Sequence, residues 1–265
     1  MSARARVWIV VALAAVAAAG TVVGVTLATR SEFQPQTSKP PPFAADPTAR
    51  PEVVRQVREA LQAWPAGTTR RLRILAARYP HSALVQLELG LALALSGQQA
   101  DAMRAWQTAE RAQPDSPSAV RAQDLRHPGS APGLPPFVPS FTRVRTPVDA
   151  HLLRGSAYQQ ILRPVSAERE FRAAVRIAPN DPEALTAAAV GLYDKDRPAL
   201  AFSRLGPLVR RFPRSQTVRF HLGLLLIYFG DMPRARHELS LARAQGPRTP
   251  LGKRAETLLK AGRKP

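Results

Sequence analysis

The apolar residues in the middle of the chain recur with the period of an α-helix. One helical face is predicted by four leucines that lie three or four residues apart: Leu84, Leu87, Leu91 and Leu95. A second face begins after Gly97, with alanines and larger side chains at the same spacing: Ala102, Met103, Trp106, Ala109 and Ala112. Pro114 ends this second helix, because proline has no backbone N–H to donate. The pattern predicts a helix–turn–helix unit over residues 83–116.

The same order of residues recurs every 34 positions, which predicts repeated units. Prolines that would end the second helix of a unit form two series with this spacing: Pro80 and Pro114, then Pro179, Pro213 and Pro247. Four of these prolines follow a small residue and then a bulky one at constant distances: Ala102 and Trp106, Ala167 and Phe171, Ala201 and Leu205, Ala235 and Leu239. Five units are predicted, with bounds near 49–82, 83–116, 148–181, 182–215 and 216–249.

This order and its period resemble those of the tetratricopeptide repeat, a helix–turn–helix unit. The resemblance implies an all-α fold, a right-handed superhelical solenoid of helix pairs over residues 51–249. Gly90, Gly155 and Gly223 recur where the two helices of a unit approach closely, so we expect a side chain there to clash. An alanine-rich helical bundle is the alternative, but a bundle does not require a fixed period of this length.

An uncharged apolar run precedes the units. Val7–Thr29 is 23 residues long and has no charge, which is enough to cross the hydrocarbon core, and it predicts a single transmembrane helix. Arg4 and Arg6 favour a cytoplasmic tail over residues 1–6, with the repeats on the other side of the cell membrane. This architecture resembles that of membrane-anchored tetratricopeptide proteins of bacterial envelopes. A cleaved signal peptide is the alternative, although the apolar run continues for ten residues past Ala19.

The apolar run also contains a pattern by which two copies of a membrane helix associate. Gly20 and Gly24 show the small-xxx-small spacing at which membrane helices pack closely. This spacing favours a weak homodimer, although alanine-rich spans often contain it by chance. The chain has no cysteine, which excludes a disulfide framework, a thiolate metal site and a lipoprotein anchor.

Three further segments flank or interrupt the units. Residues 30–50 are rich in proline and predict an extended spacer, and residues 250–265 predict a capping helix with a short tail. The insertion, residues 117–147, begins with a short predicted helix and continues in a stretch rich in proline and glycine. Leu134, Phe137 and Phe141 in this stretch either cover the groove described next or present a docking segment. The alternative is a flexible loop that remains from a lost repeat.

In tetratricopeptide proteins the first helices of the units line a concave groove that binds partner segments, and the resemblance implies such a groove here. Its predicted lining is largely apolar: Leu87, Leu91, Leu152, Val190, Tyr193, Phe220, Leu224, Ile227 and Tyr228. An apolar groove suits an amphipathic helix, an extended apolar peptide or the chain's own insertion. We therefore expect a membrane-anchored interaction scaffold or assembly factor whose partner is a protein or peptide.

A second function is predicted from the charge. The chain has 38 Lys and Arg residues against 19 Asp and Glu, a net charge of +19. Five arginines fall on second helices, which form the outer face in the family: Arg169, Arg172, Arg204, Arg234 and Arg236. The alternative to a scaffold is therefore a basic adaptor that binds nucleic acid, anionic lipid or a wall polymer through these arginines. Few aromatic residues lie among them, which disfavours nucleic acid.

No pattern of catalytic or cofactor-binding residues is visible. The five histidines are scattered without metal-ligand spacing, and no glycine-rich phosphate loop follows a strand. His151 and His221 fall on first helices, where a hydrogen-bonded structural role is favoured over that of a ligand. We expect the protein not to be an enzyme and to need no metal or cofactor.

Overall fold

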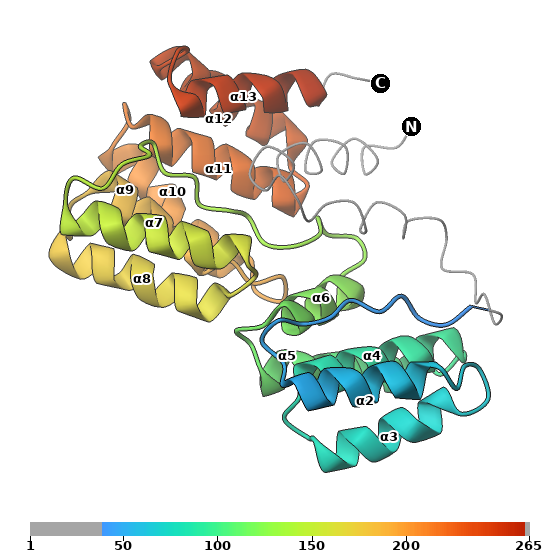
Figure 1. Ribbon diagram of the computed structural model, residues 1–265. Helices are drawn as coiled ribbons and strands as arrows, with labels where there is room; N and C mark the ends of the chain where they lie inside the picture. Colours follow the sequence, from blue (N-terminus) through green and yellow to red (C-terminus); the bar gives the residue numbers. More distant parts are fainter. Residues whose placement is uncertain (1–38, 263–265) are drawn as a thin grey trace. The chain divides into compact units, whose positions relative to one another are not determined.

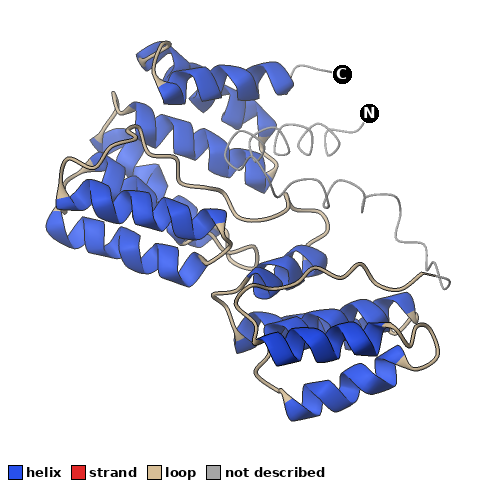
Figure 2. Ribbon diagram, in the orientation of Figure 1, coloured by secondary structure: helices blue, strands red, loops and turns tan. Residues whose placement is uncertain are grey.

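The computed structural model describes residues 39–262, and these residues form twelve α-helices without a strand (Figures 1 and 2). The all-α expectation is confirmed for this part of the chain, and its helix pairs are consistent with a tetratricopeptide-type solenoid. Val7–Thr29, with Gly20 and Gly24, lies outside the described residues. Between residues 39 and 262 no helix is long and apolar enough to cross a membrane.

The described residues divide into two compact units, residues 39–128 and residues 129–262, here called the N-terminal and C-terminal units. The division falls inside the predicted insertion 117–147. Each unit has its own cores of buried apolar side chains, one in the N-terminal unit and two in the C-terminal unit. A single array over residues 51–249 stays a prediction, as does its right-handed superhelical path.

The N-terminal unit contains five helices in two layers. Its helices are α2 (Pro51–Leu61), α3 (Thr68–Arg78), α4 (Ala83–Leu95), α5 (Gln99–Ala112) and α6 (Pro117–Arg126). The layer of first helices consists of α2, α4 and α6, in which α4 contacts both of the others, and α3 and α5 form the second layer. Since α6 has no second helix after it, it closes this unit.

The C-terminal unit repeats this arrangement with seven helices. These are α7 (Pro147–Gln160), α8 (Pro164–Ile177), α9 (Pro182–Gly191), α10 (Ala199–Arg211), α11 (Gln216–Phe229), α12 (Met232–Gln245) and α13 (Pro250–Ala261). The first-helix layer is α7, α9, α11 and α13, in which each helix contacts the next, and α8, α10 and α12 follow as second helices. The unpaired α13 closes this unit as α6 closes the other.

The first helices begin at caps that themselves recur at the repeat period. Ser82 and Ser116 accept hydrogen bonds from backbone N–H groups at the starts of α4 and α6. Asp181, Ser215 and Thr249 do the same for α9, α11 and α13. A side-chain oxygen at this position satisfies an N–H that has no partner inside the helix. The starts of these first helices are therefore marked in the sequence by cap residues with the same period as the repeats.

Within three helix pairs, a glycine of the first helix lies directly against a bulky side chain of the second. The pairs are Gly90 with Trp106, Gly155 with Phe171 and Gly223 with Leu239, and each is separated by 16 positions. A Cβ atom added to any of the three glycines would overlap the bulky side chain opposite it. The expected clash is therefore confirmed. Close approach lets the aromatic or leucine side chain bury fully, as Phe171 does.

We predict that Gly155→Ala lowers the free energy of unfolding by about 1–3 kcal/mol, because the new methyl group overlaps the Phe171 ring in a packed core. Phe171→Leu removes the ring and serves as the partner substitution. In urea unfolding followed by circular dichroism, the double variant should lose at least about 1 kcal/mol less than the two single losses added together. Strictly additive losses would contradict this packing account.

Candidate partner-binding groove

The predicted groove residues lie on first helices, but none of them is open to solvent. Leu87 and Leu91 lie on α4 of the N-terminal unit. The other seven lie in the C-terminal unit, on α7, α9 and α11 or, for Tyr193, just after α9: Leu152, Val190, Tyr193, Phe220, Leu224, Ile227 and Tyr228. The most exposed of the nine, Tyr193, exposes only 8 % of its surface. In the C-terminal unit, a segment of the same chain lies against this face.

This covering segment is residues 131–141, here called the plug, which precedes α7 and appears in yellow-green in Figure 1. Phe137 exposes 1 % of its surface and Val138 8 %, and Ala131 is also buried. Phe141 and Leu134 are partly buried against the same cores. These side chains of the insertion therefore pack against predicted groove residues of the C-terminal unit, while a partner-binding groove at this face stays a prediction.

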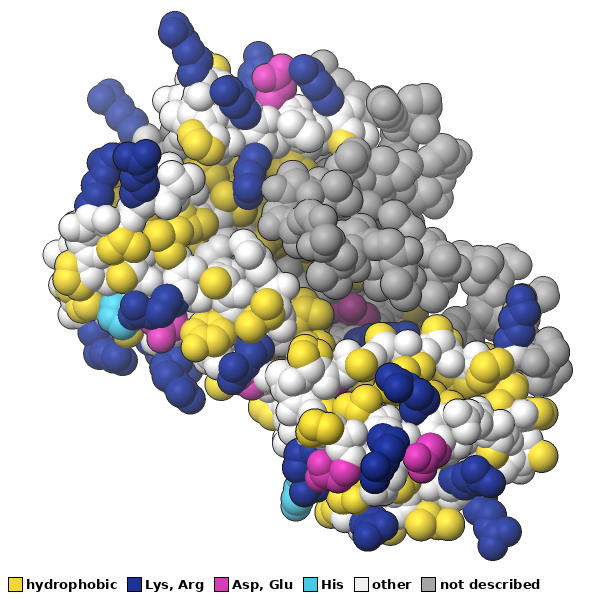
Figure 3. Space-filling model, viewed as in Figure 1, with side chains coloured by type: hydrophobic (Ala, Val, Ile, Leu, Met, Phe, Trp, Pro, Cys, Tyr) yellow, Lys and Arg dark blue, Asp and Glu magenta, His cyan; other side chains and the backbone are white. Residues whose placement is uncertain are grey.

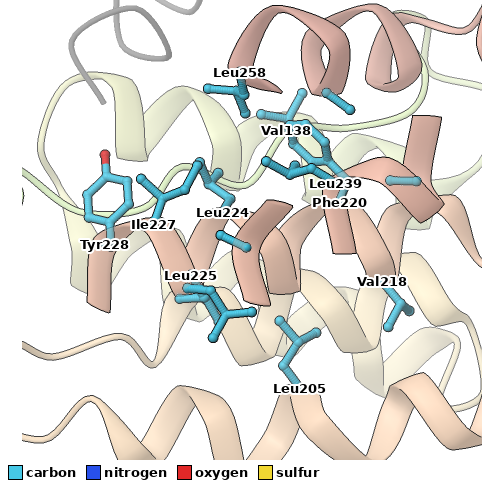
Figure 4. Close-up of a cluster of buried hydrophobic side chains, with 14 of the residues drawn as sticks. Val138, Leu205, Val218, Phe220, Leu224, Leu225, Ile227, Tyr228, Leu239 and Leu258 are labelled. Carbon is cyan, nitrogen blue, oxygen red and sulfur yellow. The ribbon is translucent and has the colours of Figure 1, made fainter. Parts of the chain in front are cut away.

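Phe137 is the central side chain of the plug. Its ring stacks on His221 of α11, with centroids 4.9 Å apart, and meets Phe171 of α8 edge to face at 5.4 Å. Val138 lies in the buried cluster formed by Phe220, Leu224 and other side chains, which Figure 4 shows. The plug therefore joins the two cores of the C-terminal unit through adjacent residues.

The backbone of the plug is held by polar side chains of the groove. The Phe137 N–H donates to Gln159 Oε1 at 2.6 Å, and the Phe137 carbonyl accepts from Ser156 Oγ at 3.0 Å. Both of these partners lie on α7, less than one turn apart. At the start of the plug, Lys195 Nζ donates to the Ala131 carbonyl at 2.7 Å. Buried backbone groups thus find partners without any helix or strand in the plug.

The groove also binds the exposed end of the plug that leads toward α7. Ser140 donates its N–H and its hydroxyl to the two carboxylate oxygens of Glu183, at 2.5 and 2.6 Å. Burial raises the pKa of Glu183, although the hydrogen bonds from Ser140 act in the opposite direction. Because Glu183 lies in the first turn of α9, its ionised form is also stabilised by the helix dipole.

The protonation of His221 follows from its two neighbours. Its Nε2 lies 2.9 Å from the N–H of Val138, so this nitrogen accepts. Its Nδ1 lies 2.7 Å from the Thr217 carbonyl, which can only accept, so Nδ1 carries the hydrogen. Burial lowers the pKa of His221 from 6.5 to about 4, and the positive charge of Arg254 adds to this effect. The neutral imidazole is thus part of the contact between the groove and the plug.

In the N-terminal unit, another proline-rich stretch lies on the first-helix layer. Asp46 is buried and accepts a hydrogen bond from the Ser118 N–H at the start of α6. Arg121 of α6 donates to the Pro42 carbonyl at 3.3 Å, and Arg58 of α2 lies over the Phe43 ring. Residues 42–46, which belong to the predicted spacer, therefore contact the first and last helices of this layer.

Glu88 of α4, the middle helix of this layer, has an unusual environment. Its side chain is fully buried, and neither carboxylate oxygen has a hydrogen-bond partner among the described residues. Burial raises the pKa of Glu88 from 4.5 to about 8, although the positive charge of Arg121 acts in the opposite direction. The carboxyl group is therefore largely protonated at neutral pH, since a charge without a partner is costly in such a site.

The five arginines of the alternative function are on second helices, and three of them already have partners. Arg172 pairs with Glu168, Arg234 pairs with Asp231, and Arg236 donates to the Gly262 carbonyl. Arg169 and Arg204 are exposed. On the face in view in Figure 3, Lys and Arg side chains are scattered and do not gather into one patch. A site for an anionic polymer on these arginines stays a prediction.

Between residues 39 and 262, no group of three or more histidine or acidic side chains is placed to hold a metal ion. His151 contacts Glu170, which also accepts from Arg154, and this cluster ties α7 to α8. The sequence pattern places His221 on a first helix, but nothing in it marks Gln159, Glu183 and Lys195, which also contact the plug.

We predict that acid destabilises the C-terminal unit through His221. The folded pKa lies below the unfolded one, so the unfolded chain binds the extra proton first, and stability falls as the pH drops from about 6.5 to 4. The expected loss is on the order of 3 kcal/mol. His221→Gln keeps an acceptor for the Val138 N–H but cannot titrate. Urea unfolding at pH 7 and pH 5 should therefore show a smaller loss in this variant than in the wild type, and equal losses would contradict the assignment.

Glu88 predicts the opposite pH dependence for the N-terminal unit. Its folded pKa is raised, so the unfolded chain releases the proton first, and stability falls as the pH rises from about 4.5 to 8. Glu88→Gln should remove this loss. The gain in free energy of unfolding of the variant over the wild type should be more than about 1 kcal/mol larger at pH 8 than at pH 4.5. Thermal unfolding at both pH values tests this, with Glu52→Gln, which changes a carboxylate on the surface of α2, as the control. A stabilisation of the same size at both pH values would refute the pKa explanation.

One comparison with known proteins identifies the type of the helix pairs in the N-terminal unit. No curated protein matches the chain. Residues 70–117 match the family model of the tetratricopeptide repeat, and this range covers most of α3 and all of α4 and α5. This match supports helix pairs of the tetratricopeptide type over residues 70–117.

Proposed function

We propose that the protein is an interaction scaffold that binds an extended protein segment on the first-helix face of its C-terminal unit. Tetratricopeptide repeats generally mediate protein–protein interaction, and residues 70–117 match this family. The observation that carries the proposal is the plug itself, because this face already holds an extended stretch of chain by its backbone and by Phe137. The groove residues Leu152, Leu224 and Tyr228 form the apolar floor of such a site.

The second part of the proposal is the place of the scaffold in the cell. Val7–Thr29 is apolar and long enough to anchor the chain in a membrane, and Arg4 and Arg6 favour a cytoplasmic N-terminus. The scaffold would then face the other side of a bacterial cell membrane, and its partner would be a protein of that compartment. No catalytic role, metal or cofactor is part of this proposal.

Cross-linking from inside the groove tests the proposal. A photoreactive phenylalanine in place of Gln159 faces the plug, whereas the same residue in place of Ala157 is exposed on the same helix, about 200° away around the axis. In native membranes of cells that produce the full chain, we expect a defined protein adduct from position 159 and none from position 157. Equal adducts from both positions, or none from 159, would argue against a groove partner.

Charge reversal on the outer face distinguishes the alternative function. Arg169→Glu and Arg204→Glu change two exposed second-helix arginines and leave the groove unchanged. For a groove-binding scaffold, the adduct from position 159 should form to the same extent in this double variant. If the adduct disappears and binding of an anionic polymer falls with it, the basic adaptor is the better description.

A further inference from the structure

We infer that the plug is an exchangeable, built-in competitor for the groove, and that the partner segment shares its pattern: an extended stretch with adjacent Phe and Val and a small residue six positions earlier. This inference rests on the proposed function and specifies the chemistry of the partner. It follows from how the plug is held, from its sequence, and from its attachment to the chain.

The contacts of the plug are of the type by which peptides are recognised. The groove side chains of Gln159, Ser156 and His221 bind backbone N–H and C=O groups, which every extended peptide offers. Such main-chain bonds provide affinity that does not depend on sequence, while buried side chains provide specificity. The buried residues of the plug are Ala131, Pro135, Phe137 and Val138. Phe137, Val138 and Ala131, with Pro135 between them, therefore define the pattern of an alternative occupant.

The sequence of the plug keeps residues 134–139 extended without neighbouring strands, while the chain bends at Gly133, whose φ is +69°. Prolines at positions 132, 135, 136 and 139 fix their own backbone angle. They also push the preceding residues, among them Leu134 and Val138, into extended conformations. An extended, proline-rich segment loses little conformational freedom when it binds, which is why such segments serve as ligands in other proteins. The plug thus resembles a ligand more than a structural element.

The α7–α8 pair is held by contacts that do not involve the plug. Gly155 contacts Phe171 directly, and α7 and α8 are further tied by Glu170 with His151 and Arg154. On one side the plug continues into residues 142–146, all of which are exposed. The plug is therefore attached at the surface on this side, and its removal leaves these contacts of the α7–α8 pair in place.

The covalent attachment explains why the plug occupies the groove when no partner is present. A segment joined to its site by a few residues acts at an effective concentration in the millimolar range. A free partner at micromolar concentration competes only if it binds the open groove about a thousandfold more tightly or if the plug is loosened. The apparent affinity for any partner is thus its affinity for the open groove multiplied by the fraction of grooves that the plug leaves open.

The test uses the full chain in detergent and a fluorescent peptide with the sequence of residues 130–142, SAPGLPPFVPSFT. The variant Phe137→Ser, Ser140→Ala weakens the plug and leaves every groove residue unchanged. Fluorescence anisotropy should show that the peptide binds this variant at least about tenfold more tightly than the wild type, because more grooves are open. A peptide with serine in place of the phenylalanine should bind neither protein. A folded variant that binds the peptide no better than the wild type would overturn the inference.

A second form of the protein covers the case in which that variant does not fold. Protease sites introduced at residues 127–130 and 142–145 allow the native plug to be cut free on both sides. We expect the cut protein to keep its helical circular dichroism signal and to exchange the plug fragment for excess labelled peptide. If the fragment never exchanges, or if the helices are lost with it, the plug is a fixed part of the core and the inference is wrong.

The outcomes separate this inference from the proposed function. Peptide exchange without a protein adduct from position 159 means that the groove binds the plug pattern but has no partner in the membranes tested. An adduct from position 159 without peptide exchange means that the scaffold function stands while the competitor role of the plug fails. Both results are decisive, because the peptide assay does not depend on the identity of the partner.

Discussion

Close contact between a small residue of one helix and a bulky residue of the next is the interaction on which the rest of this structure depends. Gly155 lets the Phe171 ring lie directly against the backbone of α7, and Gly90 does the same for Trp106. This contact recurs at a fixed spacing in three helix pairs. Within each unit the first helices fall into one layer and the second helices into the other. The groove is a consequence of this layering, since its apolar residues come from neighbouring first helices of one layer.

The groove in the C-terminal unit is apolar at its floor and polar at its edges, and the plug satisfies both parts. Phe137 fills the floor, and Gln159, Ser156 and Glu183 bind the backbone or hydroxyl groups beside it. An apolar floor left open to water would cost free energy in proportion to its area. An unpaired buried amide or carboxylate would cost more. A segment that meets both demands is therefore a stable occupant even though it has no secondary structure.

The fold was predictable from the sequence because its determinants repeat. Alanine, bulky residue and proline return at one period, and the caps Ser82, Ser116, Asp181 and Ser215 add an independent signal of the same period. The family resemblance predicted the apolar residues of the groove, but it did not predict that Gln159 and Lys195 bind the plug. These residues contact a segment that occurs once, so no second copy of the pattern marks them. The partners Val138 and His221 are 83 positions apart, and local periodicity does not encode such a contact.

The plug also changes how cooperatively the C-terminal unit unfolds. A stack of helix pairs is nearly one-dimensional, since each pair touches only its neighbours, and such stacks can open from one end without disturbing the other. The bond between Val138 and His221, with Phe137 between the two cores, links the first helix pair of the unit to the last. The first and last helix pairs are thereby connected through the plug as well as through the pair between them. Fraying at α7 must break contacts at α11, so the array behaves as one cooperative body for as long as the plug is in place.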